Sequence, residues 1–324
     1  MNLQNDLELA DASGLCDGGY VIGMDLGGTK IHAAAALPDG KIVAERTVRV
    51  EVSGSEVYDQ IAELINGLAS EMGRARLALR CVCIGVPGVN HPETQLITRA
   101  PNVPALTSVD AVHRLKELAG APIVVENDVN LAAIGEWHNR GLKVGVLVVI
   151  ALGTGIGMGI VVDGQLLRGQ HGGAGEIADL PLEGDPFVPA DDKATLETAV
   201  STRGLVRSRE TLGDSDQIDG ASVIAAADRG DSLASAAVSY YTQQVARAIL
   251  CVRAVLDPGT VVLTGGIGSH PAILRGVTTW LTLAGAPGSL VAPSGLDSRA
   301  GVVGAINLAL DSANGSPNGY PLIT

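Results

Sequence analysis

YVIGMDLGGTKIHAAAALPDGKIVAERTVRVEV, the stretch from residue 20 to residue 52, decides the fold. Two β-rich runs flank the glycine turn Asp25-Leu-Gly-Gly-Thr-Lys30, and a Pro-Asp-Gly turn at residues 38–40 leads into a third run. Such turns between alternating apolar runs are typical of β-hairpins. The stretch therefore predicts three consecutive strands that begin an α/β domain.

The rest of the chain continues this domain and then repeats its pattern. The first unit is predicted to continue with a helix at about 55–72, the buried strand CVCIGVPG, a proline-containing loop, a helix near 109–118, the strand APIVVEN and a helix from about Asp128. The second unit is predicted to open with VGVLVVIAL, a GTG turn, IGMGIVV, the turn Asp163-Gly164 and the run QLLRG. Helices at about 194–209, 221–228 and 233–256 are predicted to follow. The unit is then expected to end with the strand TVVLTGG, a helix near 271–283, a strand near 289–292 and a helix at about 298–310. Two similar units, each opened by strand, glycine turn and strand, predict two α/β domains that face a cleft.

The glycine turn of the second unit does not predict a Rossmann dinucleotide site. Its sequence, Gly153-Thr-Gly-Ile-Gly-Met-Gly159, is rich in glycine. A dinucleotide fingerprint, however, requires a helix directly after the glycines, so that pyrophosphate lies at the helix N-terminus. The residues that follow here, IVVDGQLL, alternate like a strand and then turn.

Composition excludes several classes of protein. The 324 residues carry a formal net charge of −13, and only 2% of them are aromatic. An acidic surface repels nucleic acid and anionic membranes, and so few aromatic side chains do not make base-stacking platforms. The length suits domains that each bury their own core. We therefore expect neither nucleic acid nor membrane as a partner.

The four cysteines, Cys16, Cys81, Cys83 and Cys251, are too few and too scattered for a disulfide scaffold. Cys81 and Cys83 point to one face of a strand and are interpreted as apolar filling, because zinc sites of this type need three or four ligands. The first residues lack the pattern of a signal peptide, and no apolar run reaches the roughly 20 residues of a membrane span. We expect a cytoplasmic protein.

The two glycine turns are candidate phosphate sites. Glycine lets backbone N–H groups approach phosphate oxygens without a Cβ in the way. The first turn adds a carboxylate for hydrated Mg²⁺ (Asp25), a hydroxyl (Thr29) and a cation (Lys30). Either turn alone could be only a tight hairpin, but the pair, at the same place in each unit, favours a grip on one triphosphate.

A third candidate is Glu126-Asn127-Asp128-Val-Asn130, which follows a buried strand and begins a helix. One of these residues could serve only as the helix N-cap, a common role worth about 1 kcal/mol. The segment supplies four polar side chains, however, at the carboxyl end of a strand, where ligands bind in α/β sheets.

Taken in order, these motifs resemble those of the ROK family (repressors, uncharacterised reading frames and sugar kinases). The matching motifs are Asp25-Leu-Gly-Gly-Thr-Lys30, Gly85-Val-Pro-Gly88, Glu126-Asn-Asp-Val-Asn130, Gly153-Thr-Gly-Ile-Gly157 and Gly172-Gly-Ala-Gly-Glu176. Leu263-Thr-Gly-Gly-Ile267 resembles the adenosine-side loop of that family. The similarity extends from Tyr20 to Leu310, and the ordered set is specific although no single motif is.

The resemblance implies a two-domain actin/hexokinase-like (ribonuclease H-like) α/β fold with an active-site cleft between the domains. Residues 20–137 and 297–313 are expected to form the small N-terminal domain, and residues 138–296 the large C-terminal domain. Residues 1–19 are expected to be a loose extension, and residues 314–324 a tail.

The implied function is an ATP-dependent sugar kinase that phosphorylates a hexose hydroxyl, with glucose to glucose 6-phosphate as the first expectation. Asp128 is the implied catalytic base, and Asp25 holds Mg²⁺ through water. The implied sugar-binding residues are Gly88, Asn102, Asn127, Asp128, Glu176, Asp179 and Glu197. The implied ATP-binding residues are Gly27, Gly28, Thr29, Lys30, Gly153, Thr154, Gly155, Gly157, Gly265 and Gly266. A homodimer or homotetramer is also implied.

The chain departs from the family pattern in one region. Members of the family often have Gly-His after Glu-Ile, followed by a cysteine-rich zinc knot. Ala178-Asp179 stands at the Gly-His place here, and residues 180–194 contain no cysteine. We therefore expect no zinc, with Asp179 accepting a hydrogen bond from the sugar or, alternatively, only facing solvent.

The alternative function is a non-catalytic sugar-binding regulator or sensor, because the family includes repressors. Repressors of the family carry a DNA-binding winged helix ahead of the first glycine motif. Only 24 residues precede Asp25, too few for three helices of average length, about 11 residues each. The kinase is therefore the favoured prediction, and a sensor would have no DNA-binding domain.

Overall fold

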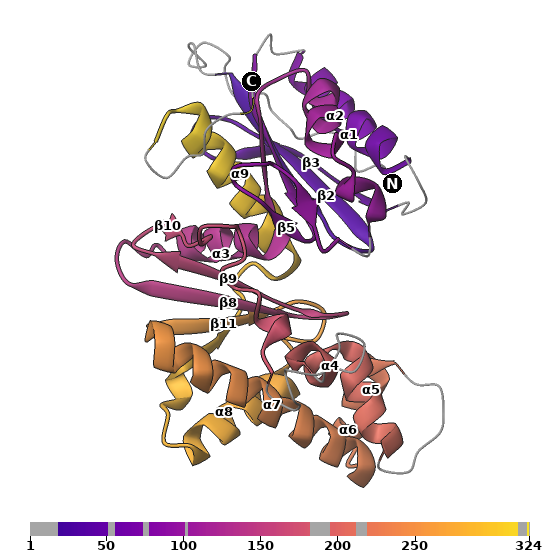
Figure 1. The fold of residues 1–324 in the computed structure, drawn as a ribbon, viewed down its shortest axis with the longest axis vertical. Coiled ribbons are helices and arrows are strands. Elements are labelled where there is room, and N and C mark those ends of the chain that lie inside the picture. Colours follow the sequence, from indigo (N-terminus) through magenta and orange to yellow (C-terminus); the bar gives the residue numbers. More distant parts are fainter. Residues whose placement is uncertain are drawn as a thin grey trace, which may run out of the picture.

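The computed structural model describes residues 19–50, 56–73, 78–100, 103–181, 195–211, 219–316 and 323. Two five-stranded sheets organise the chain, each covered by helices on both faces (Figure 1). This is the predicted arrangement of two α/β units. The predicted extension at 1–19 lies almost wholly outside the described residues, as do most of the last residues of the predicted tail.

The first sheet has the strand order β3-β2-β1-β4-β7. Its strands are β1 (Tyr20–Leu26), β2 (Lys30–Ala36), β3 (Ile42–Arg49), β4 (Leu79–Val86) and β7 (Ile123–Asn127). The strands β1 to β3 are antiparallel neighbours, as the two turns predict, whereas β4 and β7 run parallel to β1. Helices α1 (Glu56–Gly73) and α2 (Ala111–Ala119) cover one face, and α9 (Ala300–Ala313) crosses the other (Figure 1).

The second sheet repeats this order as β10-β9-β8-β11-β12. Its strands are β8 (Val146–Leu152), β9 (Ile156–Val162), β10 (Gln165–Leu166), β11 (Thr260–Thr264) and β12 (Val291–Pro293). Helix α3 (Asp128–Asn139) lies on the face toward the first sheet. The opposite face carries α4 (Leu196–Val200), α5 (Thr202–Thr211), α6 (Gly220–Asp228), α7 (Ser232–Leu256) and α8 (Pro271–Leu283).

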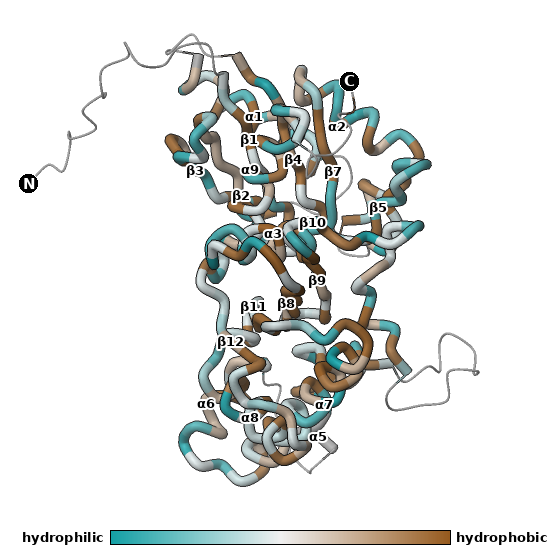
Figure 2. Tube along the Cα trace, turned by 90° about the vertical axis from the view of Figure 1, so that its left-hand side faces the viewer, coloured by the Kyte–Doolittle hydropathy of each residue, from teal (hydrophilic) through white to brown (hydrophobic). Residues whose placement is uncertain are grey.

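The apolar residues follow these layers. The strands β8 and β9 are hydrophobic along their length (Figure 2), because both faces of this sheet are buried. Cys81 and Cys83 are fully buried in the cluster that joins the first sheet to α9, so their prediction as apolar filling is confirmed. Within the described ranges, no helix is long and apolar enough to cross a bilayer.

Helices α3 and α9 cross with their backbones in contact. A Cβ on Gly304 would lie 1.8 Å from the carbonyl oxygen of Leu131, so only glycine permits this approach. The crossing places the last helix of the chain beside the helix that starts at Asp128. The predicted domain boundary at residues 137/138 falls near the end of α3, which packs against both sheets, and the domain limits stay a prediction.

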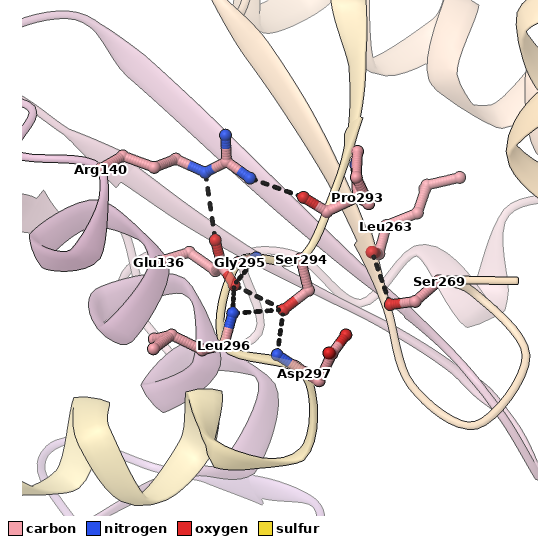
Figure 3. Close-up of polar contacts among 9 residues, drawn as sticks. All are labelled: Glu136, Arg140, Leu263, Ser269, Pro293, Ser294, Gly295, Leu296 and Asp297. Atoms are coloured by element: carbon pink, nitrogen blue, oxygen red, sulfur yellow. Dashed lines mark hydrogen bonds and ion pairs between the residues drawn. The ribbon is translucent and has the colours of Figure 1, made fainter. Parts of the chain in front are cut away.

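A buried carboxylate ties α3 to the connection that leads into α9 (Figure 3). The side chain of Glu136 is fully buried. Its Oε1 accepts hydrogen bonds from Ser294 Oγ at 2.5 Å and from the backbone N–H groups of Gly295 and Leu296 at 2.9 and 3.1 Å. Its Oε2 accepts from Arg140 Nε at 3.1 Å. Ion pairing and hydrogen bonds offset the cost of burying this charge, and they fix the start of α9 relative to α3.

Most predicted elements lie where the sequence places them, but two do not and one observed hairpin was not predicted. The helix predicted at 194–209 is wrong: the described part is two helices, α4 and α5, separated at Ser201, whose backbone is extended. The strand predicted near 289–292 begins only at Val291, after a short 3₁₀ turn. The proline-containing loop carries a small hairpin, β5 (Val89–Asn90) with β6 (Ile97–Thr98), which the sequence analysis missed.

Candidate functional site

The first glycine turn joins β1 to β2 tightly. The backbone N–H of Gly27 donates to the carbonyl oxygen of Lys30 at 3.0 Å, and Gly28 and Thr29 are exposed. This geometry leaves the tip of the predicted phosphate turn open to a ligand. Asp25 lies just before the turn, at the carboxyl end of β1.

The Asp25 carboxylate is packed against the start of α9. A Cβ on Gly301 would lie 2.3 Å from Asp25 Oδ2, so any larger residue there would crowd this carboxylate. Burial raises the pKa of Asp25 to about 6, although the charges of His32 and Lys30 oppose the shift. A nearby cation would favour the ionised form, and a hard carboxylate oxygen is a ligand that Mg²⁺ prefers. The Asp25 carboxylate therefore fits a role in holding hydrated Mg²⁺.

Asn127, the last residue of β7, is the N-cap of α3. Its Oδ1 accepts from the backbone N–H groups of Val129 and Asn130, at 2.9 and 3.0 Å. Its Nδ2 donates to the carbonyl oxygen of Gly88 at 2.9 Å. The capping role that the sequence left open therefore falls to Asn127, and its predicted sugar contact stays a prediction.

Asp128 is the first residue of α3 and is electrostatically coupled to the end of β1. Its Oδ1 accepts from the backbone N–H of Val129 at 2.9 Å. Burial and then the charge of Asp25 raise the pKa of Asp128 to about 7, with Glu176 adding to the rise and backbone N–H groups opposing it. A carboxyl group with a pKa near neutrality is suited to general acid–base work.

The start of α3 also contacts the hairpin of the second sheet. A Cβ on Gly157 would lie 2.7 Å from Val129 Cγ2, so this glycine makes room for α3. Gly157 lies inside β9 rather than at the turn, and its predicted role in ATP binding stays untested. Asp128 is thereby placed between the two hairpins that carry the glycine turns.

The second glycine turn, residues 153–155, is held by hydrogen bonds from the first residue of α5. The carbonyl oxygen of Gly153 accepts two hydrogen bonds from Thr202, from its backbone N–H at 2.8 Å and its hydroxyl at 2.6 Å. Thr202 is the first residue of α5, so the break between α4 and α5 brings it to the turn. Thr154, at the tip, is exposed.

The loop after β11 meets the same edge of the sheet. Gly265 and Gly266 are exposed, and a Cβ on Gly153 would lie 4.0 Å from the backbone nitrogen of Gly266. The backbone N–H of Ile267 donates to the carbonyl oxygen of Leu152 at 3.2 Å. The structure thus brings together two of the segments predicted to bind ATP.

Glu176, Asp179 and Glu197 form a group of acidic side chains, and the charge of Glu176 acts on Asp128. Burial raises the pKa of Glu176 and of Glu197, and the charge of Asp179 adds to both shifts. Glu197 lies over the second glycine turn, because its Oε1 would be 2.3 Å from a Cβ on Gly155. Glu176 precedes the short 3₁₀ helix η3 (Ile177–Asp179) and Asp179 ends it, and both form ion pairs with Arg99. These predicted sugar residues are therefore neighbours.

A buried network behind Asp128 was missed by the sequence analysis. Glu126 accepts from Arg168 Nε at 2.7 Å, from Asn130 Nδ2 at 2.8 Å and from the backbone N–H of Asn127 at 2.8 Å. Glu126 and Asn130 are almost fully buried. With the Asn127 cap, three of the four polar residues of this motif therefore hold the start of α3 in place.

Two predictions lie partly or wholly beyond the described residues. Asn102 is outside them, as are residues 182–194 of the segment that stands at the place of a zinc knot. Among the residues that the structure does describe, no group of three or more His, Cys, Asp or Glu side chains could hold a metal ion. The expectation of no zinc stays a prediction.

The chain is similar in sequence to proteins of one family. The model of the ROK family matches residues 21–312. The glucokinase of Halalkalibacterium halodurans is 29% identical over 266 residues, which cover 76% of this chain and 80% of that protein. The β-glucoside kinase of Listeria monocytogenes is 26% identical over 297 residues, which cover 91% of this chain and 98% of that protein.

A solved structure agrees with the fold. The ROK family glucokinase from Streptomyces griseus, in complex with glucose and AMPPNP, has a TM-score of 0.73 to this chain at 25% identity. The match covers 90% of this chain and 99% of that chain. The predicted actin-like two-domain fold is confirmed by this likeness and by the two sheets of matching strand order.

Proposed function

The chain belongs to the ROK family, and on that premise we propose that it is an ATP-dependent sugar kinase that phosphorylates a hexose hydroxyl. Glucose, giving glucose 6-phosphate, is the first substrate to expect, since a glucokinase and a β-glucoside kinase are among its relatives. The observation that carries the proposal is the position of Asp128. Its carboxyl group, with a pKa raised to about 7, lies between two glycine-turn hairpins and beside further acidic side chains.

The nucleotide is assigned to the glycine segments. Gly28, Thr29 and Thr154 are exposed at the tips of the two turns, where backbone N–H groups can meet phosphate oxygens, and Gly265 and Gly266 lie beside the second turn. Asp25 would hold Mg²⁺ through water. When bound, the ion neutralises phosphate charge, which is the main requirement of phosphoryl transfer.

Asp128 is proposed as the catalytic base. Its carboxylate accepts the proton of the attacking sugar hydroxyl while the oxygen–phosphorus bond forms and the bond to ADP breaks. General-base catalysis contributes about 10²- to 10⁴-fold in rate. The Asn127 cap and the Glu126 network fix the backbone on either side of this carboxylate, so its orientation is set before the sugar arrives.

Sugar hydroxyls are assigned to the acidic side of the site. Glu176, Asp179 and Glu197 supply acceptors, and Gly88 and Asn127 form the wall beside Asp128. Carboxylates suit this role because ionised oxygens accept strong hydrogen bonds from hydroxyl groups.

The test of the proposed base is Asp128→Asn, which keeps the shape of the side chain and removes the basic oxygen. The value of kcat should fall by about 10²- to 10⁴-fold, while the dissociation constant for sugar, measured by calorimetry, changes by less than about fivefold. Asp39→Asn is the matched control, because Asp39 is an exposed turn residue whose Oδ1 accepts only a local hydrogen bond from Lys41. A variant at Asp128 with a kcat near that of the wild type would rule out this base.

A further inference from the structure

Arg99 reaches from one half of the molecule to the other at the acidic side of the site. It follows β6 in the first half, and its Nη1 pairs with Asp179 and, at 3.4 Å, with Glu176 Oε2. Both acids follow β10 of the second sheet. Neither the sequence motifs nor the family resemblance points to Arg99, because its role depends on partners 77 and 80 residues away.

The backbone of Arg99 is held in an uncommon conformation. Its φ of 58° lies in the left-handed region, which a non-glycine residue adopts at a cost unless its surroundings impose it. Gly88 is one such constraint: a Cβ there would lie 2.3 Å from the carbonyl oxygen of Thr98 and 3.1 Å from the carbonyl carbon of Arg99. Strained backbone of this kind is concentrated at functional sites.

The same glycine connects Arg99 to the proposed base. The carbonyl oxygen of Gly88 accepts from Asn127 Nδ2, and Asn127 caps the helix that begins with Asp128. The guanidinium group is therefore anchored to the backbone frame that carries the reacting carboxylate. It contacts two of the acids assigned to the sugar, Glu176 and Asp179.

Part of the guanidinium group remains available to a ligand. Arginine has five N–H donors in a rigid plane. In the described part of the chain, the partners of Arg99 contact only Nη1, and 55% of the side chain is exposed. Asp179 is 58% exposed and keeps acceptor capacity on its carboxylate. Donor and acceptor thus lie side by side on one edge of the site.

We propose that Arg99 is a specificity-determining residue, which together with Asp179 recognises two adjacent hydroxyl groups of a neutral sugar. The proposal rests on the proposed function, since it concerns the sugar side of the same site. The guanidinium donates to one hydroxyl, and Asp179 accepts from the next. Adjacent hydroxyls match this pair because each can both donate and accept.

Calorimetric binding of glucose and its monodeoxy derivatives, without ATP, tests the proposal. Wild-type protein should lose about 10- to 100-fold in affinity for the derivatives that lack either recognised hydroxyl, the scale for a hydrogen bond to a charged group. In Arg99→Ala the affinity for glucose should fall by about the same factor. In this variant, the deoxy sugar that lacks the hydroxyl recognised by Arg99 should bind less than about twofold more weakly than glucose.

The control is Arg46→Ala, which removes an arginine of similar exposure from the ion pair with Glu71 on the outer side of the first sheet. It should leave every sugar affinity unchanged. Asp179→Asn is a second variant, which should reduce the penalty at the neighbouring hydroxyl. If the penalties of all deoxy sugars are the same in Arg99→Ala as in the wild type, Arg99 is only a structural link and the proposal is wrong.

A pH profile tests the ion pair that holds Arg99 beside the acidic side chains. Burial raises the pKa of Glu176, and the charges of Asp179 and Glu197 add to this rise, whereas the charge of Arg99 opposes it. The charge of Glu176 also acts on Asp128. In Arg99→Ala the pKa of Glu176 should rise further, so the loss of glucose affinity on acidification should begin at a higher pH. An unshifted profile would contradict the ion pair with Glu176 on which the position of Arg99 depends.

The binding experiment also distinguishes the two proposals. A wild type that binds glucose but transfers no phosphoryl group would overturn the kinase and leave the Arg99 experiment fully interpretable. A wild type that phosphorylates glucose, with unchanged penalties in Arg99→Ala, would overturn only the role of Arg99. A wild type that binds none of these sugars would overturn both.

Discussion

Asp128→Asn should stabilise the folded protein at the pH where it abolishes activity. Burial and the charge of Asp25 raise the pKa of Asp128 from 3.8 to about 7. A carboxyl group whose pKa is higher in the folded chain binds its proton more tightly when folded. Its contribution to stability is therefore complete below the unfolded pKa, declines as the pH rises above that value, and is fully lost above the folded pKa.

The size of the effect follows from the shift. About three pKa units correspond to a ceiling of about 4 kcal/mol at pH 8, and relaxation around the charge reduces the expected gain to about 2 kcal/mol. At an unfolding entropy of about 2 cal/mol/K per residue, a chain of this length gains about 3 °C in Tm. At pH 5 only about a third of the interval between the two pKa values has been crossed, and the gain should be about 1 °C.

Thermal unfolding followed by circular dichroism, without sugar or nucleotide, measures this difference. Asp39→Asn, at an exposed turn, should show no pH-dependent gain. A lower Tm for Asp128→Asn at pH 8, or a gain of equal size at pH 5 and pH 8, would refute the account of a carboxylate destabilised by burial. Such a trade of stability for function is common at active sites.

Two further predictions concern the second glycine turn and the metal content. Thr202→Val removes the hydroxyl that donates to the carbonyl oxygen of Gly153 at 2.6 Å. In steady-state assays KM for ATP should rise about three- to tenfold, as for one lost hydrogen bond, while KM for sugar stays unchanged. An unaffected KM for ATP would show that the turn does not depend on Thr202. Elemental analysis should find less than about 0.1 zinc per chain, because residues 178–194 contain no cysteine or histidine. About one zinc per chain would contradict this.

The sequence was sufficient for the parts of the fold that depend on local pattern. Alternation and glycine turns predicted β1, β2, β8 and β9, and helical periodicity predicted α1, α7 and α8 close to their observed bounds. Cys81 and Cys83 were correctly predicted as core residues. The break at Ser201 was missed because residues on both sides are helical by pattern, whereas the interruption serves a contact between Thr202 and Gly153, 49 residues away.

The candidate site was predictable only in part, for the same reason. Motif residues such as Asp25 and Asp128 could be singled out because they lie beside turns and strand ends. Arg99 and Arg168 could not, because each is an isolated arginine in the sequence whose partner lies 80 and 42 residues away, respectively. Glu126 was found as part of a polar motif, but its burial with Arg168 depends on tertiary packing that no local pattern encodes.

The most direct test of the central claim is product analysis of the wild-type protein with ATP, Mg²⁺ and glucose. Phosphorus NMR and an ADP assay on the same sample should show one sugar phosphate formed for each ADP released, with little ADP in the absence of sugar. Asp128→Asn should form neither at a comparable rate. Glucose binding by calorimetry, with no sugar phosphate from glucose or from any other hexose of a panel, would contradict the kinase and identify the protein as a sugar sensor.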